Sequence, residues 1–530
     1  MKKERLEKMK KMKKIIAILI ALTLCFVLAA CTKTNSNTDS GSSAGPPASP
    51  GKRYLDSIEV LGEANIAAVD PYHPGGSGGV NRSLYSCIYD RLVFFSEGEY
   101  LPELATSWEV DNAQVYTFHL RDDVKFHNGD SFTAQDVIDT YNIAIAGVGS
   151  TGYEAWRPVA SAVALDEYTV QLTLGEPNAD FMYKITTTGA SIVSKAARDA
   201  DPVKGPWVGT GAFYVTEYPS PDLVVIVRND DYWGGVMPTR QISFRYLPET
   251  AARTIALQNG ESQISFNISP QDLAWFESSP DFEVITYTSN VINTIGFNMN
   301  DPITGDLNFR LAVAYATSNP EITVASSGDY AIPVTDGAVW GWGTEFKNTS
   351  LPAIPYDLDL ARQYLAASTY NGEELELITG NPDNHRGGEM IQEQLLQIGV
   401  RVRLYQTDHV TLMGHTAYDN NQGQLVHYLN VFDSSAGSAR AIFYPGGVWN
   451  MVSYNNAEVN DLLDRAPSVA DVNERAALYM RVQEIVAQDL PYVGVYFSKR
   501  CITCMAGVGG IGLDADLNHN FKTVYIEVDA

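Results

Sequence analysis

The sequence predicts an α/β protein with more than one lobe, and three observations support this fold class. Short runs that alternate apolar and polar residues occur along the chain, as expected for strands covered on one or both faces. In the second half, stretches with helical spacing are followed by strand-like runs, which is the α/β pattern. β-rich and α/β stretches occur in the same chain, and this mixture indicates separate lobes.

Individual elements follow from these local patterns. Alternation predicts strands over residues 115–120, 169–174 and 223–227. Helical spacing predicts helices over residues 307–317, 390–398 and 478–486. Gly399 ends the second helix and a strand follows it, whereas Pro491 stops the third helix.

Composition and charge exclude several classes of protein. The chain has 530 residues with 45% hydrophobic and 19% charged content, which excludes a disordered or fibrous protein. At about 150 residues per domain, two to four domains are expected. The formal net charge is −26, and the first thirty residues are basic, so the rest is more acidic still. We expect no nucleic-acid partner, because such a surface repels phosphates.

The amino terminus predicts export and a lipid anchor. A basic segment precedes the apolar stretch Ile15–Ala30, which is too short for a membrane span of about 20 residues and suits a secretory signal. The stretch ends Leu28-Ala29-Ala30-Cys31, which resembles the lipobox of bacterial lipoproteins, in which the cysteine is lipidated. The alternative is an ordinary signal with a chance cysteine. Residues 32–51 are rich in Ser, Thr, Asn, Gly and Pro and predict a flexible tether.

The remaining cysteines predict neither a metal site nor a redox motif. Cys501 and Cys504 form a single C-x-x-C without a second pair of zinc ligands nearby, and Cys87 is isolated. A redox C-x-x-C begins a helix after a strand, whereas this one lies in a strand-like run. A structural disulfide or two free thiols therefore remain, and we expect no metal and no cofactor.

Ordered blocks between residues 54 and 529 resemble a known family. The most specific is Pro102–Val110, followed by Tyr116–Arg121, Val124–Asp130 and Phe132–Val137. Further blocks follow in the family's order: Val69–Pro71, Val208–Phe213, Arg228–Trp233, Arg310–Thr317, Tyr356–Leu365, Gln394–Val400 and Tyr454–Leu463. Together they closely resemble the family 5 solute-binding proteins, the peptide- and nickel-type receptors of ABC importers. Locally, residues 128–130 predict a turn and Thr133 the cap of the next helix.

The resemblance implies a two-lobed clamshell like that of periplasmic binding proteins (type II), with an extra inserted small domain that makes three lobes. The expected organisation is a signal peptide over residues 1–30, the lipidated cysteine and tether over 31–53, lobe I over 54–92, 208–292 and 493–530, lobe II over 93–207, and lobe III over 293–492. The ligand would lie between the first and third lobes, which would close about two chain crossings near residues 292 and 493.

The resemblance also points to residues that would hold a peptide's amino terminus. Peptide binders of this family pair it with an Asp that follows a Trp-x-x-Asp motif. Asp433 occupies the Asp position, but Asn430 replaces the Trp, and the Tyr-x-x-Pro expected afterwards is absent. A carboxylate facing an ammonium in a dry cleft is a strong contact. The alternative is that Asp433 turns a loop.

Three residues are candidates for binding the ligand's carboxylate. His427 stands where oligopeptide-type members have an Arg, six residues before the Asp. His385 falls near the position of a family His in a loop before the predicted helix at Met390, with Arg386 beside it. An Arg would bind a carboxylate with two hydrogen bonds, a His with one. Each could instead be an ordinary surface or loop residue.

Two further groups could line the site. The glycine-rich loop with Gly75, Gly76 and Ser77 follows the Asp-Pro block, and in the family this loop pairs its backbone with the peptide. It has no phosphate-binding fingerprint, and a plain flexible loop is the alternative. Trp340 and Trp449 are flanked by glycine, which makes them poor core candidates and possible walls of side-chain pockets.

These features predict a receptor and not an enzyme. The sequence has no nucleophile elbow or zinc-protease motif, although a carboxylate pair of the glycosidase kind is compatible with the composition. The expected function is the capture of di- or oligopeptides by a monomeric lipoprotein that delivers them to ABC permease subunits with cytoplasmic ATPases. Alternatives are a nickel chelate, an oligosaccharide or a signalling peptide as the ligand and, in another class, a secreted hydrolase.

Overall fold

The computed structural model describes residues 47–530 apart from residues 64, 67, 74–78, 97, 149, 338, 433–434 and 515–516. The described residues belong to one compact unit. No helix among them is long and apolar enough to span a bilayer. The predicted signal peptide and Cys31 lie outside the described residues.

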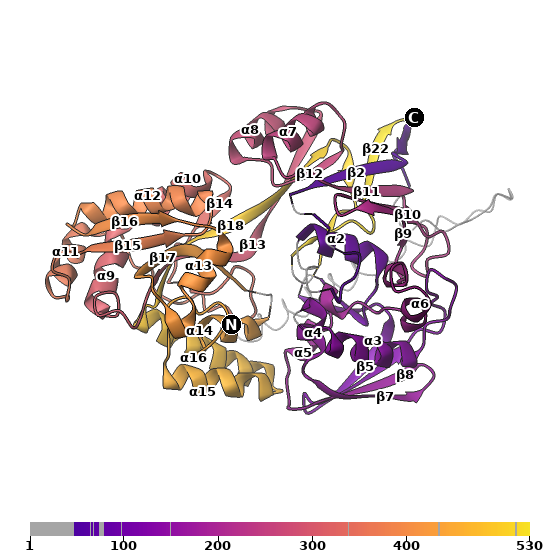
Figure 1. The fold of residues 1–530 in the computed structure, drawn as a ribbon, viewed down its shortest axis with the longest axis horizontal. Coiled ribbons are helices and arrows are strands. Elements are labelled where there is room, and N and C mark those ends of the chain that lie inside the picture. Colours follow the sequence, from indigo (N-terminus) through magenta and orange to yellow (C-terminus); the bar gives the residue numbers. More distant parts are fainter. Residues whose placement is uncertain are drawn as a thin grey trace, which may run out of the picture. The chain divides into compact units, whose positions relative to one another are not determined.

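The largest sheet contains eleven strands, and its two longest strands lie side by side at its centre (Figure 1). The strand order is β16-β15-β17-β13-β18-β12-β2-β11-β10-β9, with β14 paired to β18 beside this path. The strands are β2 (Ser57–Gly62), β9 (Phe213–Ser220), β10 (Leu223–Arg228), β11 (Gln241–Tyr246), β12 (Ile264–Phe266), β13 (Phe282–Phe297), β14 (Ala331–Pro333), β15 (Glu374–Thr379), β16 (Arg401–Gln406), β17 (Leu425–Val431) and β18 (Tyr492–Met505).

Strands β13 and β18 connect the two halves of this sheet. They are antiparallel from the Phe282–Met505 pair to the Gly296–Tyr492 pair. Strand β12 pairs with the far end of β18, and β17 pairs with β13 over Val291–Phe297. The register shifts between Thr288 and Ile292, so the long ladder is irregular near its middle. Such irregularities bend a strand and increase its twist.

A separate four-stranded sheet forms within the segment predicted to be inserted. Its order is β5-β6-β8-β7 and all neighbours are antiparallel. The strands are β5 (Ala105–Asp111), β6 (Val115–Leu120), β7 (Val159–Asp166) and β8 (Thr169–Leu174). The side chains of β6 and β8 alternate between buried and partly buried, as the sequence pattern predicts.

Short strands complete the β structure. Strand β1 pairs with β22 near the carboxyl terminus, so Lys52 lies opposite Asp529. The short strands are β1 (Lys52–Tyr54), β3 (Val93–Ser96), β4 (Glu99–Pro102), β19 (Val508–Gly509), β20 (Gly512–Leu513), β21 (His519–Asn520) and β22 (Tyr525–Asp529).

The α-helices of the described residues are concentrated in the second half, as predicted. They are α2 (Gly79–Ile88), α3 (Ala134–Ala146), α4 (Thr151–Trp156), α5 (Phe181–Lys184), α6 (Lys195–Ala200), α7 (Thr250–Gln258), α8 (Pro270–Ser278), α9 (Leu307–Ala316), α10 (Asn319–Ser327), α11 (Leu358–Ala366), α12 (Pro382–Leu396), α13 (His409–His415), α14 (Ala439–Phe443), α15 (Ala457–Arg465) and α16 (Val472–Asp489). Single 3₁₀ turns are η1 (Thr188–Ala190), η2 (Gly205–Trp207), η3 (Tyr418–Asn420), η4 (Ala436–Ser438) and η5 (Ala466–Ser468).

Most of the predicted elements are confirmed within two or three residues, but two helices begin earlier than predicted: α16 at Val472, six residues before Leu478, and α12. The three predicted strands are β6, β8 and β10, and the first and third helices are α9 and α16. The cap at Thr133 is also confirmed, because its backbone N–H donates to Oδ2 of Asp136 over 2.8 Å. Helix α12 begins at Pro382, eight residues before Met390.

The early start of α12 has a local cause. Asn381 caps the helix by accepting the backbone N–H of Asn384 at 2.8 Å, and Pro382 suits the first helical position. Gly387 and Gly388 have low helix propensity, so they weaken the helical pattern in the sequence. A Cβ on Gly387 would overlap Ser326 Oγ, so close packing requires glycine there.

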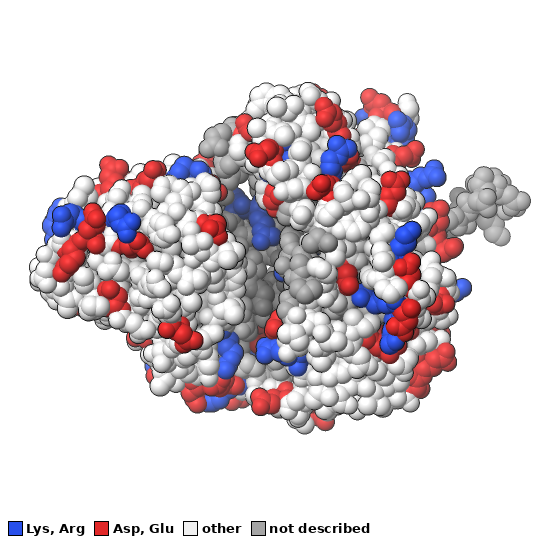
Figure 2. Space-filling view, viewed as in Figure 1, with Lys and Arg blue, Asp and Glu red and all other residues white. Residues whose placement is uncertain are grey.

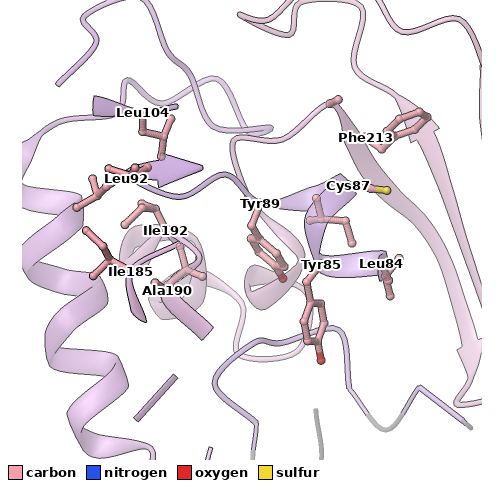
Figure 3. Close-up of a cluster of buried hydrophobic side chains, with 14 of the residues drawn as sticks. Leu84, Tyr85, Cys87, Tyr89, Leu92, Leu104, Ile185, Ala190, Ile192 and Phe213 are labelled. Carbon is pink, nitrogen blue, oxygen red and sulfur yellow. The ribbon is translucent and has the colours of Figure 1, made fainter. Parts of the chain in front are cut away.

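The hydrophobic core has several clusters. The largest combines residues of α2, the four-stranded sheet and the first half of the large sheet. Figure 3 shows part of it, where Cys87 of α2 lies near Phe213 of β9. Two further clusters contain residues of β13, β15 and β17 and of the helices from α9 to α16. Gly209 and Gly211 approach the end of α2 so closely that a Cβ would overlap Ile88.

Candidate functional site

The structure contains a cavity of about 1440 Å³, about three times the volume of a second cavity of about 490 Å³. Most of its lining comes from three stretches, residues 150–189, 431–449 and 500–519. Its volume exceeds that of ordinary small-molecule pockets, which are about 300–1,000 Å³. The face drawn in Figure 2 is hollowed, and Lys and Arg side chains lie at the margins of the hollow.

The wall from residues 431–449 begins where β17 ends. Val431 is the last residue of the strand, and the fully buried Phe432 follows it. Helix α14 and the loop after it carry the half-buried Trp449, whose ring lies 5.8 Å from the His409 ring. The wall therefore offers aromatic surface next to backbone at a strand end.

The wall from residues 150–189 contains a buried acid. Asp180 precedes α5, and the Tyr479 hydroxyl of α16 donates to its Oδ2 over 3.1 Å. Burial raises the pKa of Asp180, while Arg475 and the Tyr479 hydrogen bond oppose this shift. The backbone N–H of Ala179 donates to the Pro467 carbonyl over 2.8 Å. These bonds join the segment before α5 to residues of η5 and α16.

The cavity is lined by more basic than acidic side chains, although the whole chain is acidic. The basic ones are Arg82, Arg157, Lys184, Arg440 and Arg500, and the acidic ones are Glu63, Glu154 and Asp180. Some of these charges are already paired: Arg157 contacts Glu154, and Arg440 contacts Asp464 outside the lining. The cavity therefore favours a ligand with at least one negative group.

Of the residues predicted to contact the ligand, Trp449 lines the large cavity, while His427 and Asn430 are buried and are not part of its lining. His427 lies on β17 and is fully buried, with Nδ1 2.9 Å from the Thr294 carbonyl oxygen. Its burial lowers its pKa to about 4, so the imidazole is neutral at pH 7. Asn430 donates to Thr294 Oγ1 over 3.3 Å and is also buried. Neither borders the cavity.

His385 and Arg386 lie on α12 and not in a loop, which corrects the sequence prediction. His385 Nδ1 lies 3.2 Å from Thr379 Oγ1. Arg386 contacts Asp383 at 2.6 Å and the Ser326 carbonyl at 2.8 Å. Arg386 lines a second cavity of about 490 Å³, and neither residue borders the large one.

Trp340 is a core residue, contrary to the expectation from its flanking glycines. It has no exposed surface, and its ring lies 5.1 Å from Phe432 and 6.0 Å from Phe443. The close backbone explains the glycine: a Cβ on Gly341 would overlap the Asn290 carbonyl. Trp340 therefore packs against Phe432, which itself borders the cavity.

The other predicted site residues, Gly75, Gly76, Ser77 and Asp433, lie outside the described residues. Val431 and Phe432, the two residues before Asp433, line the cavity.

Sequence reasoning missed Asp180, Tyr479 and Arg500 as cavity residues. Tyr479 follows the helical spacing of α16 and resembles any core aromatic. Arg500 had a detectable signal, because Ser498, Lys499 and Arg500 interrupt an otherwise apolar strand. A polar interruption in a buried strand often marks a site where the strand faces a cavity.

The described residues contain no group of three or more His, Cys, Asp or Glu side chains placed to hold a metal. Cys87, Cys501 and Cys504 are buried free thiols, so the disulfide alternative is not what the structure contains. Burial raises the pKa of Cys501 to about 11, so this thiol is protonated at neutral pH.

The large cavity has side chains of both charges and is partly lined by β13 and β18, the strands that connect the two halves of the large sheet. This arrangement is that of a ligand-binding protein of the α/β class. Residues 99–480 match the profile described as "Bacterial extracellular solute-binding proteins, family 5 Middle". The match covers more than half of the chain, and the chain belongs to this family. This confirms the predicted family.

Known relatives and solved structures match most of the length of this chain. The chain is 26% identical to heme-binding protein A of Haemophilus influenzae over 78% of this chain and 82% of that protein. It is 25% identical to the dipeptide-binding protein of Escherichia coli (strain K12) over 83% and 89%. The structure of the ABC transporter substrate-binding protein CtaP of Listeria monocytogenes matches with a TM-score of 0.81 at 23% identity, over 89% of this chain and 99% of that chain. The likeness confirms the predicted fold class.

Proposed function

We propose that this protein is the substrate-binding lipoprotein of an ABC importer that captures peptides and delivers them to a membrane permease. The observation that carries the proposal is the cavity of about 1440 Å³ in a chain of this family. The dipeptide-binding relative supports peptides as the ligand class. The protein would act as a monomer, with permease subunits and cytoplasmic ATPases as partners.

The cavity has the features that binding a peptide requires. It combines aromatic surface at Phe432 and Trp449 with polar and charged side chains of both signs. A zwitterionic ligand that is enclosed in such a site keeps partners for both of its ends. The proposal includes no chemical step, so the ligand leaves the protein unchanged.

Capture would involve closure of the predicted lobes about β13 and β18. These strands connect the halves of the large sheet, and the register shift near Thr288 gives a place where they can bend. The lobe boundaries predicted from the sequence, near residues 292 and 493, fall within these two strands.

A thermal unfolding screen tests the proposal. The full chain, with the lipid site removed by Cys31→Ala, is heated with di- to pentapeptides, sugars, nickel chelates and heme. Peptides should raise the melting temperature in proportion to the logarithm of their concentration. A response to heme or to metal chelates alone would favour the second candidate ligand class, which the heme-binding relative supports. Peptide hydrolysis in the same samples would favour the hydrolase alternative.

The lipid anchor is part of the proposal and has its own test. The basic segment, short apolar stretch and Leu28–Cys31 ending support it. Wild-type protein should fractionate with membranes, and Cys31→Ala should appear in the soluble fraction or medium. A Cys31→Ala protein that stays with the membranes would contradict the anchor.

Asp433 remains the proposed partner of the ligand's amine, supported by its motif position and by its neighbours Val431 and Phe432 in the cavity wall. Asp433→Asn and N-acetylation of the peptide should each weaken binding, by roughly two to three and a half decades. The combined loss should be little more than either alone, because both changes remove the same contact. Additive losses in isothermal titration would contradict this role.

A further inference from the structure

The carboxyl-terminal part of the cavity wall contains a cation, Arg500, that takes part in none of the ion pairs found among the described residues. Arg500 lies on β18 opposite Tyr287 of β13 and lines the cavity. Its Nη1 donates to Asn518 Oδ1 over 3.5 Å, which is a long bond. None of the ion pairs found among the described residues includes Arg500, and the carboxylate nearest in the hydrogen-bond network, Asp514, contacts Asn518.

The residues beside Arg500 are neutral and can donate hydrogen bonds. Asn518 is held in place by Asp514, whose Oδ1 accepts its backbone N–H at 2.8 Å and its side-chain amide at 3.2 Å. His519 is only 3% exposed, and its Nε2 has no hydrogen-bond partner among the described residues. Burial and the nearby Arg500 lower the pKa of His519 to about 3, so the ring is neutral at pH 7.

Aromatic rings surround this group and reduce its contact with water. The His519 ring lies 5.1 Å from the Tyr287 ring and 5.3 Å from the Phe266 ring. Phe266 also borders the cavity, as does Asn267 after it. An ion pair next to apolar surface is stronger than one in open water, because water screens it less. The neutral His519 and Asn518 leave the positive charge of Arg500 available to a ligand.

We propose that Arg500, with Asn518 and His519 beside it, binds a carboxylate group of the ligand. The proposal rests on the proposed function, since it assigns one end of the captured molecule. The planar guanidinium matches a carboxylate with two parallel hydrogen bonds. A peptide can supply this group from its carboxyl terminus or from an acidic side chain. His427, His385 and Arg386, which the sequence suggested for this role, do not border the cavity.

Isothermal titration with defined peptides tests the assignment. The probes are tetra-alanine as the free acid, its carboxyl-terminal amide, and the amide with one alanine replaced by aspartate. Wild-type protein should bind the free acid about ten-fold or more tightly than the amide. If Arg500 binds an acidic side chain and not the carboxyl terminus, the aspartate-containing amide should bind about ten-fold more tightly than the plain amide, and the free acid should not. Equal binding of all three probes would overturn the proposal and leave the proposed function intact.

Variants at two neighbouring positions separate recognition from folding. Arg500→Gln should remove the preference for the carboxylate, and Arg500→Lys should restore part of it because the charge returns without the planar fork. Lys499→Gln is the matched control: it is the adjacent cation on β18, but it lines the smaller cavity. It should keep the full preference. An Arg500→Gln protein that loses affinity equally for acid and amide would overturn the proposal.

A non-peptide carboxylate distinguishes failure of the inference from failure of the proposed function. Citrate is titrated into wild type, Arg500→Gln and Lys499→Gln, with the melting temperature as the readout. If no peptide binds but citrate stabilises wild type and Lys499→Gln and not Arg500→Gln, the carboxylate site stands and the peptide function fails. If neither peptides nor citrate bind, both fail.

Discussion

At the scale of single residues, buried charges in this protein are held by several partners at once. Lys522 lies within 2.6 Å of Asp90 Oδ1 and 2.9 Å of Glu103 Oε1, and all three side chains are largely buried. Arg91 also contacts Glu103 at 3.2 Å. Burial alone would lower the pKa of Lys522, but Asp90 and Glu103 raise it well above its usual value. The ammonium therefore stays charged and links the carboxyl-terminal segment to residues just after α2 and β4.

Replacing Lys522 should destabilise the fold strongly. Lys522→Met keeps the length of the side chain but leaves Asp90 and Glu103 with less compensation, which typically costs about 3–5 kcal/mol. Urea unfolding at pH 7 measures the loss. Lys52→Met is the matched control, because Lys52 pairs with Asp529 in an exposed ion pair and its removal should leave the midpoint nearly unchanged. Equal effects of the two substitutions would contradict the assignment.

His427 should make stability depend on pH between about 7 and 4. Burial lowers its pKa from the ordinary 6.5 to about 4. The unfolded chain therefore binds more protons in this range, so the free energy of unfolding falls as the pH falls. The share of His427 should be about 2 kcal/mol between pH 7 and pH 5. His427→Gln should lose that much less stability over the same interval, and an unchanged pH slope would contradict the buried neutral imidazole.

Single residues also show where sequence reasoning stops. Trp449, chosen from its local context, lines the cavity, whereas His427, chosen from the family resemblance, lies on β17 away from the lining. Whether a side chain on β17 faces a cavity or a neighbouring strand depends on how the strands pair. His427 contacts the Thr294 carbonyl of β13, the strand that pairs with β17. That pairing joins residues 133 positions apart, so the local pattern cannot reveal it.

At the scale of elements, α5 and α16 meet through one buried polar contact. The Tyr479 hydroxyl donates to Asp180, and Gly437 lies so close that a Cβ there would contact Asp180 Oδ2 at 2.7 Å. Asp180 belongs to the predicted lobe II and Tyr479 to the predicted lobe III. This contact, present in the structure, joins the two predicted lobes and borders the cavity, so it should favour a closed arrangement of these lobes.

Tyr479→Phe should therefore shift the protein toward an open form. Losing a hydrogen bond to a buried carboxylate should weaken ligand binding by about ten-fold and increase the radius of gyration of the free protein in small-angle scattering. Tyr454→Phe is the matched control, because Tyr454 donates to Asp489 over 2.7 Å and both residues belong to the predicted lobe III. It should lower stability without changing the scattering. A Tyr479→Phe protein with unchanged scattering and affinity would contradict the closing contact.

The elements themselves were largely predictable, and α12 shows the limit. In strands β6 and β8, every second side chain is buried, as expected for a sheet with one covered face. Helix α12 contains two glycines in its first half, which weaken the helical signal in the sequence. Their reason is tertiary: Ser326 and His427 pack against Gly387. A helix that is shaped by packing of distant segments cannot be bounded from its own residues.

At the scale of the whole molecule, the large sheet determines where the ligand cavity lies. Strands β13 and β18 join its two halves, and the cavity of about 1440 Å³ is lined mostly by stretches before, between and at the end of these strands. The ordered family blocks made this architecture predictable from the sequence. The chemistry of the cavity was not predictable, because Asp180, Tyr479 and Arg500 come from segments far apart in the chain.

Native mass spectrometry of the protein purified without unfolding tests the central claim most directly. The account predicts one intact peptide per chain, or a single peptide adduct after incubation with a peptide mixture, with no cleavage products. The peptide should be displaced by excess of a second peptide, because both occupy one cavity. A protein that carries no ligand and forms no peptide adduct, or that returns hydrolysed fragments, would contradict the claim that it captures peptides.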